Sequence, residues 1–174
     1  MFKLEQIQTK ERILRAGTRC IDLGAAPGGW SQFAAQIVAP KGQVWAIDLT
    51  PMAPIDGVEI IEGDFTSAQT LALMTRALQA SKVDLVMSDV APNITGSRAV
   101  DQPRAMHLAE EALELCRTVL RPGGSFLVKL FQGEGFEDFV DVARAQFQKV
   151  RLIKPKASRP ESREIYLLAR NYAI

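Results

Sequence analysis

The chain has few residues of the types that build metal centres or disulfide frameworks. It holds one histidine, His107, and two cysteines, Cys20 and Cys116, among 174 residues. The cysteines lie far apart in apolar stretches, with no Cys-x-x-Cys pair and no cluster of histidines. This pattern excludes a zinc site and a disulfide framework. We expect no bound metal, and we expect both cysteines to be reduced core residues of a cytoplasmic protein.

Long apolar runs are also missing. No run of about 18 or more apolar residues is present, so we expect no transmembrane helix. The stretch from Met1 to Gln6 has no apolar core followed by small residues, so we expect no secretory signal. Hydrophobic residues make up 47% of the chain and charged residues 24%, as in ordinary soluble proteins. Residues 1–174 are therefore predicted to form a single domain.

The net charge of +1 does not by itself predict a polyanionic partner, but the charge is unevenly distributed. Between residues 149 and 170 seven basic residues accompany two acidic ones, a local excess of +5. The basic residues are Lys149, Arg151, Lys154, Lys156, Arg159, Arg163 and Arg170, and the acidic residues are Glu161 and Glu164. A basic end on an otherwise acidic domain is a weak indication of nucleic-acid binding.

Apolar segments with strand and helix spacing alternate along most of the chain. The predicted helices are 4–15, 30–38, 67–80, 103–119 and 136–147, the fourth opened by Pro103 and stopped before Pro122-Gly123-Gly124. The predicted strands are 20–23, 44–49, 58–61, 84–89, 125–131, 150–153 and 165–168.

The middle strands are continuously apolar, which is typical of a parallel sheet covered on both faces. The last two strands follow each other without a helix, so they should pair antiparallel. We therefore predict an α/β, Rossmann-like fold with a seven-stranded, mostly parallel sheet, an antiparallel last strand and helices on both faces.

A glycine-rich turn follows the first predicted strand. It reads Asp22-Leu23-Gly24-Ala25-Ala26-Pro27-Gly28-Gly29. The dinucleotide template Gly-x-Gly-x-x-Gly is not met, and the early proline leaves fewer amides for a pyrophosphate. The pattern Asp-x-Gly-x-x-Pro-Gly-Gly instead favours the S-adenosyl-L-methionine loop of a methyltransferase over NAD(P) or FAD binding.

Acidic residues end the next two strands at the same edge of the sheet. Asp48 is placed to accept hydrogen bonds from the ribose hydroxyls of the cofactor, and Asp64 from its adenine amine. Either acid alone is equally explained as a turn former or a helix cap. The candidate cofactor-binding residues are Asp22, Gly24, Ala25, Pro27, Gly28, Gly29, Trp30, Asp48, Leu49, Asp64, Phe65 and Asp89.

A carboxylate and a lysine end the two central strands that follow. Asp89 closes the fourth strand and Lys129 lies within the fifth, so neighbouring strands would bring them together over the methyl group. A ribose 2′-hydroxyl must be oriented and deprotonated, and a lysine held beside a carboxylate can stabilise the developing alkoxide or act as the base. The alternative is a strand-end lysine that extends its amine to water.

Four stretches together resemble the FtsJ/RrmJ-type 2′-O-ribose methyltransferases, and the resemblance covers nearly the whole chain from Phe2 onward. The stretches are Asp22–Trp30, Ser88–Asn93, Arg121–Gly135 and Lys156–Tyr166. The resemblance implies S-adenosyl-L-methionine as cofactor and a uridine of large-subunit ribosomal RNA as substrate, within the large ribosomal subunit. It also implies a cytoplasmic monomer that works in ribosome biogenesis.

The family uses a Lys-Asp-Lys-Glu tetrad, which the resemblance carries onto Lys3, Asp89, Lys129 and Glu164. In the family picture Lys129 activates the 2′-hydroxyl, Asp89 and Lys3 orient it, and Glu164 has a supporting part. Members usually carry an arginine-rich segment before their Phe-Lys-Leu, whereas this chain begins at Met1-Phe2. We therefore expect Lys3 to lie on a poorly anchored terminus and RNA affinity to be reduced.

Other functions and other site residues stay open at this point. The rival functions are methylation of another RNA, a protein or a small molecule, and a non-catalytic RNA-binding module of the same fold. Trp30 and Phe131 have the shape to stack on a base, but core packing is favoured. Arg98 and Arg104 either contact RNA or belong to a solvated loop, and His107 is not expected to be catalytic.

Overall fold

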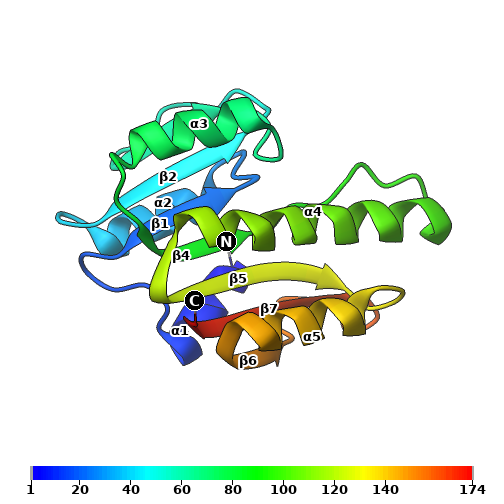
Figure 1. The fold of residues 1–174 in the computed structure, drawn as a ribbon. Coiled ribbons are helices and arrows are strands. Elements are labelled where there is room, and N and C mark those ends of the chain that lie inside the picture. The colour runs from blue at the N-terminus through cyan, green and yellow to red at the C-terminus, as the bar shows by residue number, and fades with distance from the viewer. Residues whose placement is uncertain (1, 174) are drawn as a thin grey trace.

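A computed structural model describes residues 2–173, which form a seven-stranded sheet in the order β3-β2-β1-β4-β5-β7-β6 (Figure 1). The strands are β1 (Arg19–Leu23), β2 (Gln43–Asp48), β3 (Val58–Glu62), β4 (Val83–Ser88), β5 (Leu120–Phe131), β6 (Phe147–Ile153) and β7 (Glu164–Tyr172).

The direction of the strands matches the prediction. The pairs from β3 through β5 are parallel, and β7 is antiparallel to both β5 and β6. From β1 the chain first builds the sheet outward to β3, and then returns to place β4 on the other side of β1. The strand order therefore reverses between β1 and β4, which is where open sheets of this kind bind ligands.

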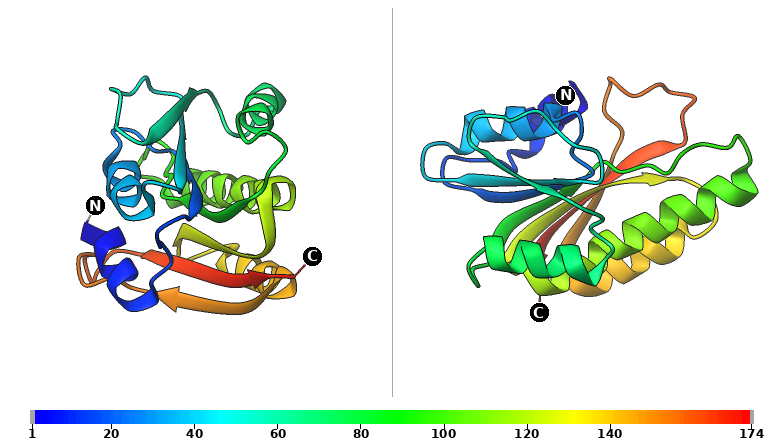
Figure 2. Two further views of the ribbon diagram at one scale, coloured as in Figure 1. Left: turned by 90° about the vertical axis from the view of Figure 1, so that its left-hand side faces the viewer. Right: turned by 90° about the horizontal axis from the view of Figure 1, so that it is seen from above.

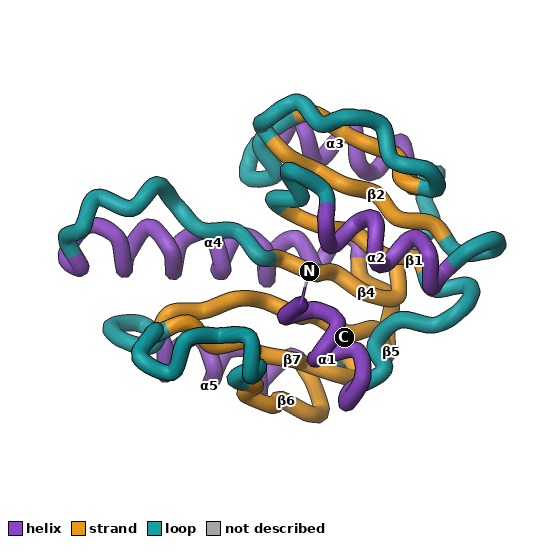
Figure 3. Tube along the Cα trace, turned by 180° about the vertical axis from the view of Figure 1, so that it is seen from behind, coloured by secondary structure: helices purple, strands orange, loops and turns teal. Residues whose placement is uncertain are grey.

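Helices cover both faces of the sheet (Figure 2), and the buried apolar residues form two separate cores. The helices are α1 (Phe2–Glu11), α2 (Gly29–Val38), α3 (Ala68–Ala77), α4 (Arg98–Val119) and α5 (Phe136–Gln146). The buried residues Leu4 of α1 and Ala34 of α2 belong to one core, and Met74, Leu113 and Phe139 of α3, α4 and α5 belong to the other. Figure 3 shows α1 and α2 together on the near side of the sheet.

Helix α1 is shorter and better anchored than the sequence suggested. It ends at Glu11 rather than residue 15, because Arg12 adopts a left-handed backbone with φ +49°. Leu4 and Ile7 are fully buried against the sheet. The expectation that Lys3 lies on a poorly anchored terminus was therefore wrong, because burial of two large apolar side chains fixes the helix.

Helix α4 begins at Arg98, five residues before the predicted start, and Pro103 lies inside it. Asp101 explains the earlier start. Its carboxylate accepts hydrogen bonds from the backbone N–H groups of Thr95 (3.0 Å) and Gly96 (3.1 Å) and from the Thr95 hydroxyl (2.8 Å). These bonds fold the preceding loop onto the first turn, which the rule that places proline at the first helical position does not capture.

Boundaries of four further elements differ from the prediction. Helix α3 ends at Ala77 rather than residue 80, because Gln79 and Ala80 adopt positive φ. Strand β5 begins at Leu120 rather than residue 125, since Leu120 already pairs with Val83. Strands β6 and β7 are also longer than predicted, because they pair with each other over most of their length.

No helix among residues 2–173 is both long enough and apolar enough to cross a membrane.

Candidate active site

The glycine-rich turn after β1 is held by the end of β2. The backbone N–H groups of Gly24 and Ala25 donate to the carbonyl oxygen of Ile47 at 2.8 and 3.2 Å. Gly24 has φ +66°, and a Cβ built on it would lie 2.3 Å from Cγ2 of Val90. Only glycine fits there, so the turn lies directly against the residue that follows Asp89.

The two strand-end acids predicted to bind the cofactor are oriented by backbone groups. Asp48 accepts from the N–H of Ala26 (2.9 Å) through Oδ2 and from the N–H of Thr50 (2.8 Å) through Oδ1. Asp64 accepts from the N–H (2.9 Å) and the hydroxyl (2.7 Å) of Thr66 through Oδ1. Each carboxylate has four lone-pair positions, so both retain capacity to accept bonds from a ligand.

The neighbours of these acids differ in exposure. Leu49, directly after Asp48, is 67% exposed, which leaves an apolar side chain at the edge where the adenosyl group is expected. Phe65, directly after Asp64, is partly buried against the apolar core. At the far end of the turn, a Cβ on Gly28 would lie 2.5 Å from Cδ1 of Ile55, so the turn also closes against the loop after β2.

Two predicted cofactor residues face the interior. Asp22 is buried, and Ser31 of α2 donates to its carboxylate at 2.7 Å. Burial raises the pKa of Asp22 to about 7; the Ser31 bond opposes the shift, and the charges of Asp89 and Asp48 add to it. Trp30 is buried with its ring 5.9 Å from that of Tyr166, in agreement with core packing. Asp22 therefore fastens β1 to α2.

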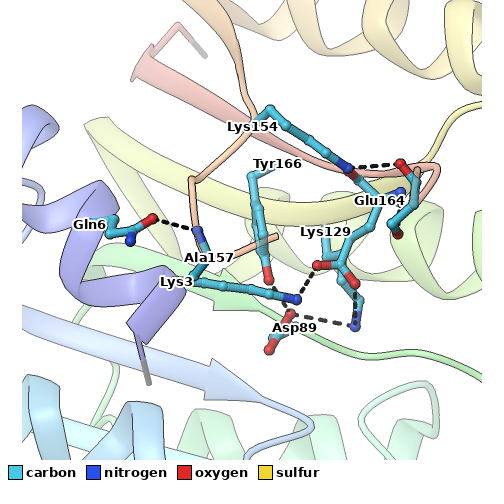
Figure 4. A network of polar contacts seen from close by, with 9 residues as sticks. Lys3, Gln6, Asp89, Lys129, Lys154, Ala157, Glu164 and Tyr166 are labelled. Atoms are coloured by element: carbon cyan, nitrogen blue, oxygen red, sulfur yellow. Dashed lines mark hydrogen bonds and ion pairs between the residues drawn. The ribbon is translucent and has the colours of Figure 1, made fainter. Parts of the chain in front are cut away.

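The four residues of the predicted tetrad meet at the ends of β4, β5 and β7 (Figure 4). Lys129 Nζ lies 3.5 Å from Asp89 Oδ1 and 4.0 Å from Glu164 Oε2. Lys3 of α1 donates to Glu164 Oε1. We call Lys3, Asp89, Lys129 and Glu164 the tetrad. Two ammonium groups and two carboxylates alternate in it, so the cluster is neutral overall when all four are ionised.

Burial strengthens the electrostatic interactions within the tetrad. The side chains of Lys129 and Glu164 are 11% and 13% exposed, whereas those of Asp89 and Lys3 are 30% and 33% exposed. Charges that are shielded from water interact more strongly than exposed ones. Lys129 therefore lies in the more buried part of the site, and Asp89 and Lys3 lie in the part that is more accessible to solvent.

Tyr166 is a site residue that the sequence analysis missed. Its hydroxyl donates to Asp89 Oδ1 at 2.8 Å, and its side chain is fully buried. Burial and the adjacent Asp89 charge raise the pKa of Tyr166 well above its usual value, so it is a permanent donor. Its alternation with Glu164 on β7 was the available signal, since residues two apart share a strand face, and Tyr166 pairs directly with Lys129.

Contacts between α1 and the loop of residues 154–164 bring Lys3 into the tetrad. Ser162 and Glu164 offer their carbonyl oxygens to Lys154 Nζ, the first at 2.8 Å. Gln6 of α1 accepts a bond from the N–H of Ala157 at 2.9 Å. These contacts hold residues 154–164 against α1, so the amino-terminal helix and the last strand position the two ends of one ion pair (Figure 4).

The site contains no grouping suited to a metal. Among residues 2–173, no three His, Cys, Asp or Glu side chains lie close enough to hold a metal ion. Both cysteines are buried, and burial raises the pKa of each thiol. His107 lies on α4 with its Nε2 3.9 Å from a carboxylate oxygen of Glu111, outside the tetrad.

A Rossmann-like sheet with a glycine turn at the reversal point and acids at the neighbouring strand ends is the architecture of the S-adenosylmethionine-dependent methyltransferases. Within that class, the chain belongs to the FtsJ-like methyltransferase family, whose sequence profile matches residues 1–172. The family resemblance seen in the sequence is thereby confirmed.

Individual relatives agree with this assignment. The chain is 53% identical, over 99% of its length and 83% of the relative's, to a protein of Alkalilimnicola ehrlichii named ribosomal RNA large subunit methyltransferase E. A crystal structure from Plasmodium falciparum, described as a putative ribosomal RNA methyltransferase, is 26% identical with a TM-score of 0.89; the match covers 98% of this chain and 95% of that one.

A more distant structure supports the fold alone. Aeropyrum pernix fibrillarin, solved with natively bound S-adenosyl-L-methionine, is 16% identical with a TM-score of 0.63. The match covers 96% of this chain and 72% of that one.

Proposed function

We propose that this protein transfers the methyl group of S-adenosyl-L-methionine to a ribose 2′-hydroxyl of large-subunit ribosomal RNA, at a uridine. The single observation that carries the proposal is Lys129 held between Asp89 and Glu164 beside the glycine turn. The family and the name of the 53% identical relative support the same reaction and the same RNA.

The cofactor is proposed to lie along the edge formed by the ends of β1, β2 and β3. S-adenosyl-L-methionine supplies a methyl group activated by the positive charge on its sulfur. The backbone of Gly24, Ala25, Pro27, Gly28 and Gly29 would line its methionine part. Asp48 would accept from its ribose hydroxyls, with the exposed Leu49 against its adenine, and Asp64 and Phe65 would bound the adenine on the far side.

The tetrad is proposed to act on the hydroxyl of the RNA. Lys129 activates the 2′-hydroxyl by stabilising the negative charge that develops on its oxygen. Asp89 and Lys3 orient that hydroxyl from the more accessible part of the site, and Glu164 holds both lysines in place. Tyr166 fixes one oxygen of Asp89, so the carboxylate cannot turn away from the acceptor.

The partner is proposed to be ribosomal RNA within the large ribosomal subunit. The basic residues between 149 and 170 support this, since they lie on β6, on β7 and on the loop that joins these strands, and basic residues attract phosphates. A single sheet supports a single domain for residues 1–174, and we propose a monomer that works in the cytoplasm.

The test is methyl transfer from labelled cofactor to large ribosomal subunits from cells that lack this methylation, followed by mapping of the label. We expect label on one ribose 2′-oxygen of a uridine. Label on a base, on several unrelated sites or only on small metabolites would contradict the proposal. Cofactor binding measured by calorimetry in parallel separates an inactive protein from one with a different acceptor.

A further inference from the structure

A small cavity of about 70 Å³ lies next to the tetrad, between the loop after β4, the first turns of α4 and the end of β5. Its walls include Ala91, Pro92 and Phe131, which are apolar. Its polar lining is Asp101, Gln102 and Arg163, and the Asp101 carboxylate already accepts bonds from the N–H groups of Thr95 and Gly96. The cavity is therefore a slot with apolar walls whose polar side carries the Arg163 guanidinium and a carboxylate bonded to the loop before α4.

Three of the four chain segments that build the tetrad continue into the walls of the slot. Ala91 lies two residues after the tetrad aspartate, and Arg163 directly precedes the tetrad glutamate. Phe131 lies two residues after Lys129 on the same face of β5, and Lys129 Nζ is 5.7 Å from the centre of its ring. A ribose placed on the tetrad therefore has its own base within reach of the slot.

Arg163 is held rigidly at the slot. Its Nη1 donates to Oε1 of Gln102 at 3.0 Å and to the carbonyl oxygen of Gln132 at 3.0 Å. All of its side-chain bonds to residues 2–173 come from Nη1. The hydrogens on Nε and Nη2 are thus available to a ligand, and a fixed planar donor loses little freedom when it binds one.

Gln102 is the residue that sets the position of this arginine. It is buried, and its Nε2 donates to the carbonyl oxygens of Phe131 (2.9 Å) and Glu134 (3.0 Å). A Cβ on Gly133 would lie 3.2 Å from both Arg163 Nη1 and the Gln102 amide, so the glycine makes room for the pair. Gln102 therefore ties the arginine to the end of the strand that carries Lys129.

The lining of the slot suits a base with carbonyl oxygens. Apolar walls and an aromatic ring receive a planar base by stacking. An arginine only donates, so it requires an acceptor at the edge of that base. Uracil presents the acceptor O4 where cytosine presents an amine, and a donor facing that position distinguishes the two.

We propose that this slot receives the base of the nucleotide being methylated, with Phe131 stacking on it and Arg163 donating to its O4. Gln102 acts as a positioning residue. This inference rests on the proposed 2′-O-methylation of a uridine and adds the residues that select the base. It makes Arg163 a specificity residue, separate from the tetrad that acts on the ribose.

The experiment compares two substrates that differ in one base. Large subunits carry either the mapped uridine or a cytidine introduced at that position, so the ribose and its 2′-hydroxyl are unchanged. Initial rates give kcat/KM for the wild type, Arg163→Met, Arg163→Lys and Phe131→Leu. Arg159→Met is the matched control, because it removes a charge from the same loop at an exposed position outside the slot.

We expect the wild type and the control to prefer uridine by about 10-fold or more. In Arg163→Met, kcat/KM on the uridine substrate should fall by about the same factor, so that the two substrates have equal kcat/KM. Arg163→Lys should also lose the preference, because a lysine cannot be held by Gln102 in the same plane. Phe131→Leu should lower both rates and keep the preference. Calorimetric cofactor binding, expected to be unchanged, shows that each variant is folded.

Two results would overturn the inference alone. One is an Arg163→Met variant that keeps the wild-type preference for uridine. The other is an Arg163→Met variant that loses the same factor in kcat/KM on both substrates, together with an Arg163→Lys variant that keeps the wild-type rates. That pair of results would indicate that Arg163 contacts a phosphate instead of the base. A wild type that methylates neither substrate, while binding cofactor, would overturn the proposed function and this inference together.

Discussion

The two halves of the sheet hold their parts of the site by different means. On the β1-β2-β3 side, the turn residues Gly24 to Ala26 bond to Ile47 and Asp48, mostly through backbone groups. On the β5-β7 side, side chains from remote parts of the chain meet: Lys3 and Glu164 are 161 residues apart, and Asp89 and Tyr166 are 77 apart.

The difference shows why one half was easier to identify from the sequence. A binding turn built from backbone groups appears in the sequence as one contiguous motif, with glycine where φ is positive. A side-chain cluster leaves single lysines and carboxylates scattered over the chain, each with an ordinary explanation as a surface charge. Substitutions should therefore separate cofactor binding in the first half from acceptor chemistry in the second.

The largest expected effect is on catalysis, from Lys129→Met. Methyl transfer to ribosomal subunits should fall by about 1,000-fold or more, because the developing negative charge loses its nearby ammonium. The cofactor affinity should change little, since Lys129 lies outside the glycine turn. Rates and calorimetry test this, with Lys41→Met at an exposed loop as control. A variant that retains wild-type rates would refute the role of Lys129.

The next largest effect should fall on the other half, from Gly24→Ala. The added Cβ would meet Val90 at 2.3 Å in a left-handed backbone, so the turn must move. We expect cofactor affinity to fall about 10-fold or more and stability to drop by about 2 kcal/mol. Gly17→Ala is the matched control, because Gly17 has φ +91° and a Cβ added there would meet nothing within 4 Å. Equal losses of affinity in both variants would contradict the close-contact argument.

Tyr166→Phe should have a smaller effect, confined to the acceptor half. It removes the bond to Asp89 and keeps the ring that packs on Trp30. A hydrogen bond to a charged group contributes about 1.5–3 kcal/mol, so we expect kcat to fall about 10-fold. The KM for the cofactor should stay the same. If instead only that KM rises, Tyr166 shapes the cofactor side and not Asp89.

The smallest effect should be on the pH dependence of stability, from Asp22→Asn. The pKa of Asp22 is about 7 in the folded protein, above its ordinary value of 3.8. Between those values the native state binds more protons than the unfolded state, so this residue's stabilising contribution is lost as pH rises through about 7. Asparagine can still accept the Ser31 bond and carries no charge.

Thermal unfolding at about pH 5.5 and about pH 8.5 measures this. The Tm of Asp22→Asn relative to wild type should rise by about 3 °C or more between the two conditions. Ser31→Ala serves as the control, because it removes the bond and leaves the buried carboxyl. A constant difference in Tm across the range would show that Asp22 does not titrate there.

The sequence predicted the sheet well where strands are continuously apolar, and less well at helix ends. The seven strands, the antiparallel pairing at the end of the chain and helices on both faces are confirmed. The start of α4 was misplaced because Asp101 binds the loop before it, a contact that depends on the folded loop. The anchoring of α1 was missed because Leu4 and Ile7 are buried by partners elsewhere in the chain.

Local chemistry in the sequence was enough for the class of cofactor. The glycines and the proline form one contiguous turn, and the acids follow recognisable strands, so the spacing of these residues carries the information. Asp89 and Lys129 were predicted from two neighbouring strands, whereas Lys3 and Glu164 were named only through family resemblance. The meeting of all four rests on the register of β5 with β7 and on the loop that holds α1. Tyr166, Gln102 and the fixed guanidinium of Arg163 emerged only in the folded chain, because hydrogen bonds between residues far apart in sequence exist only once packing brings their atoms within about 3 Å.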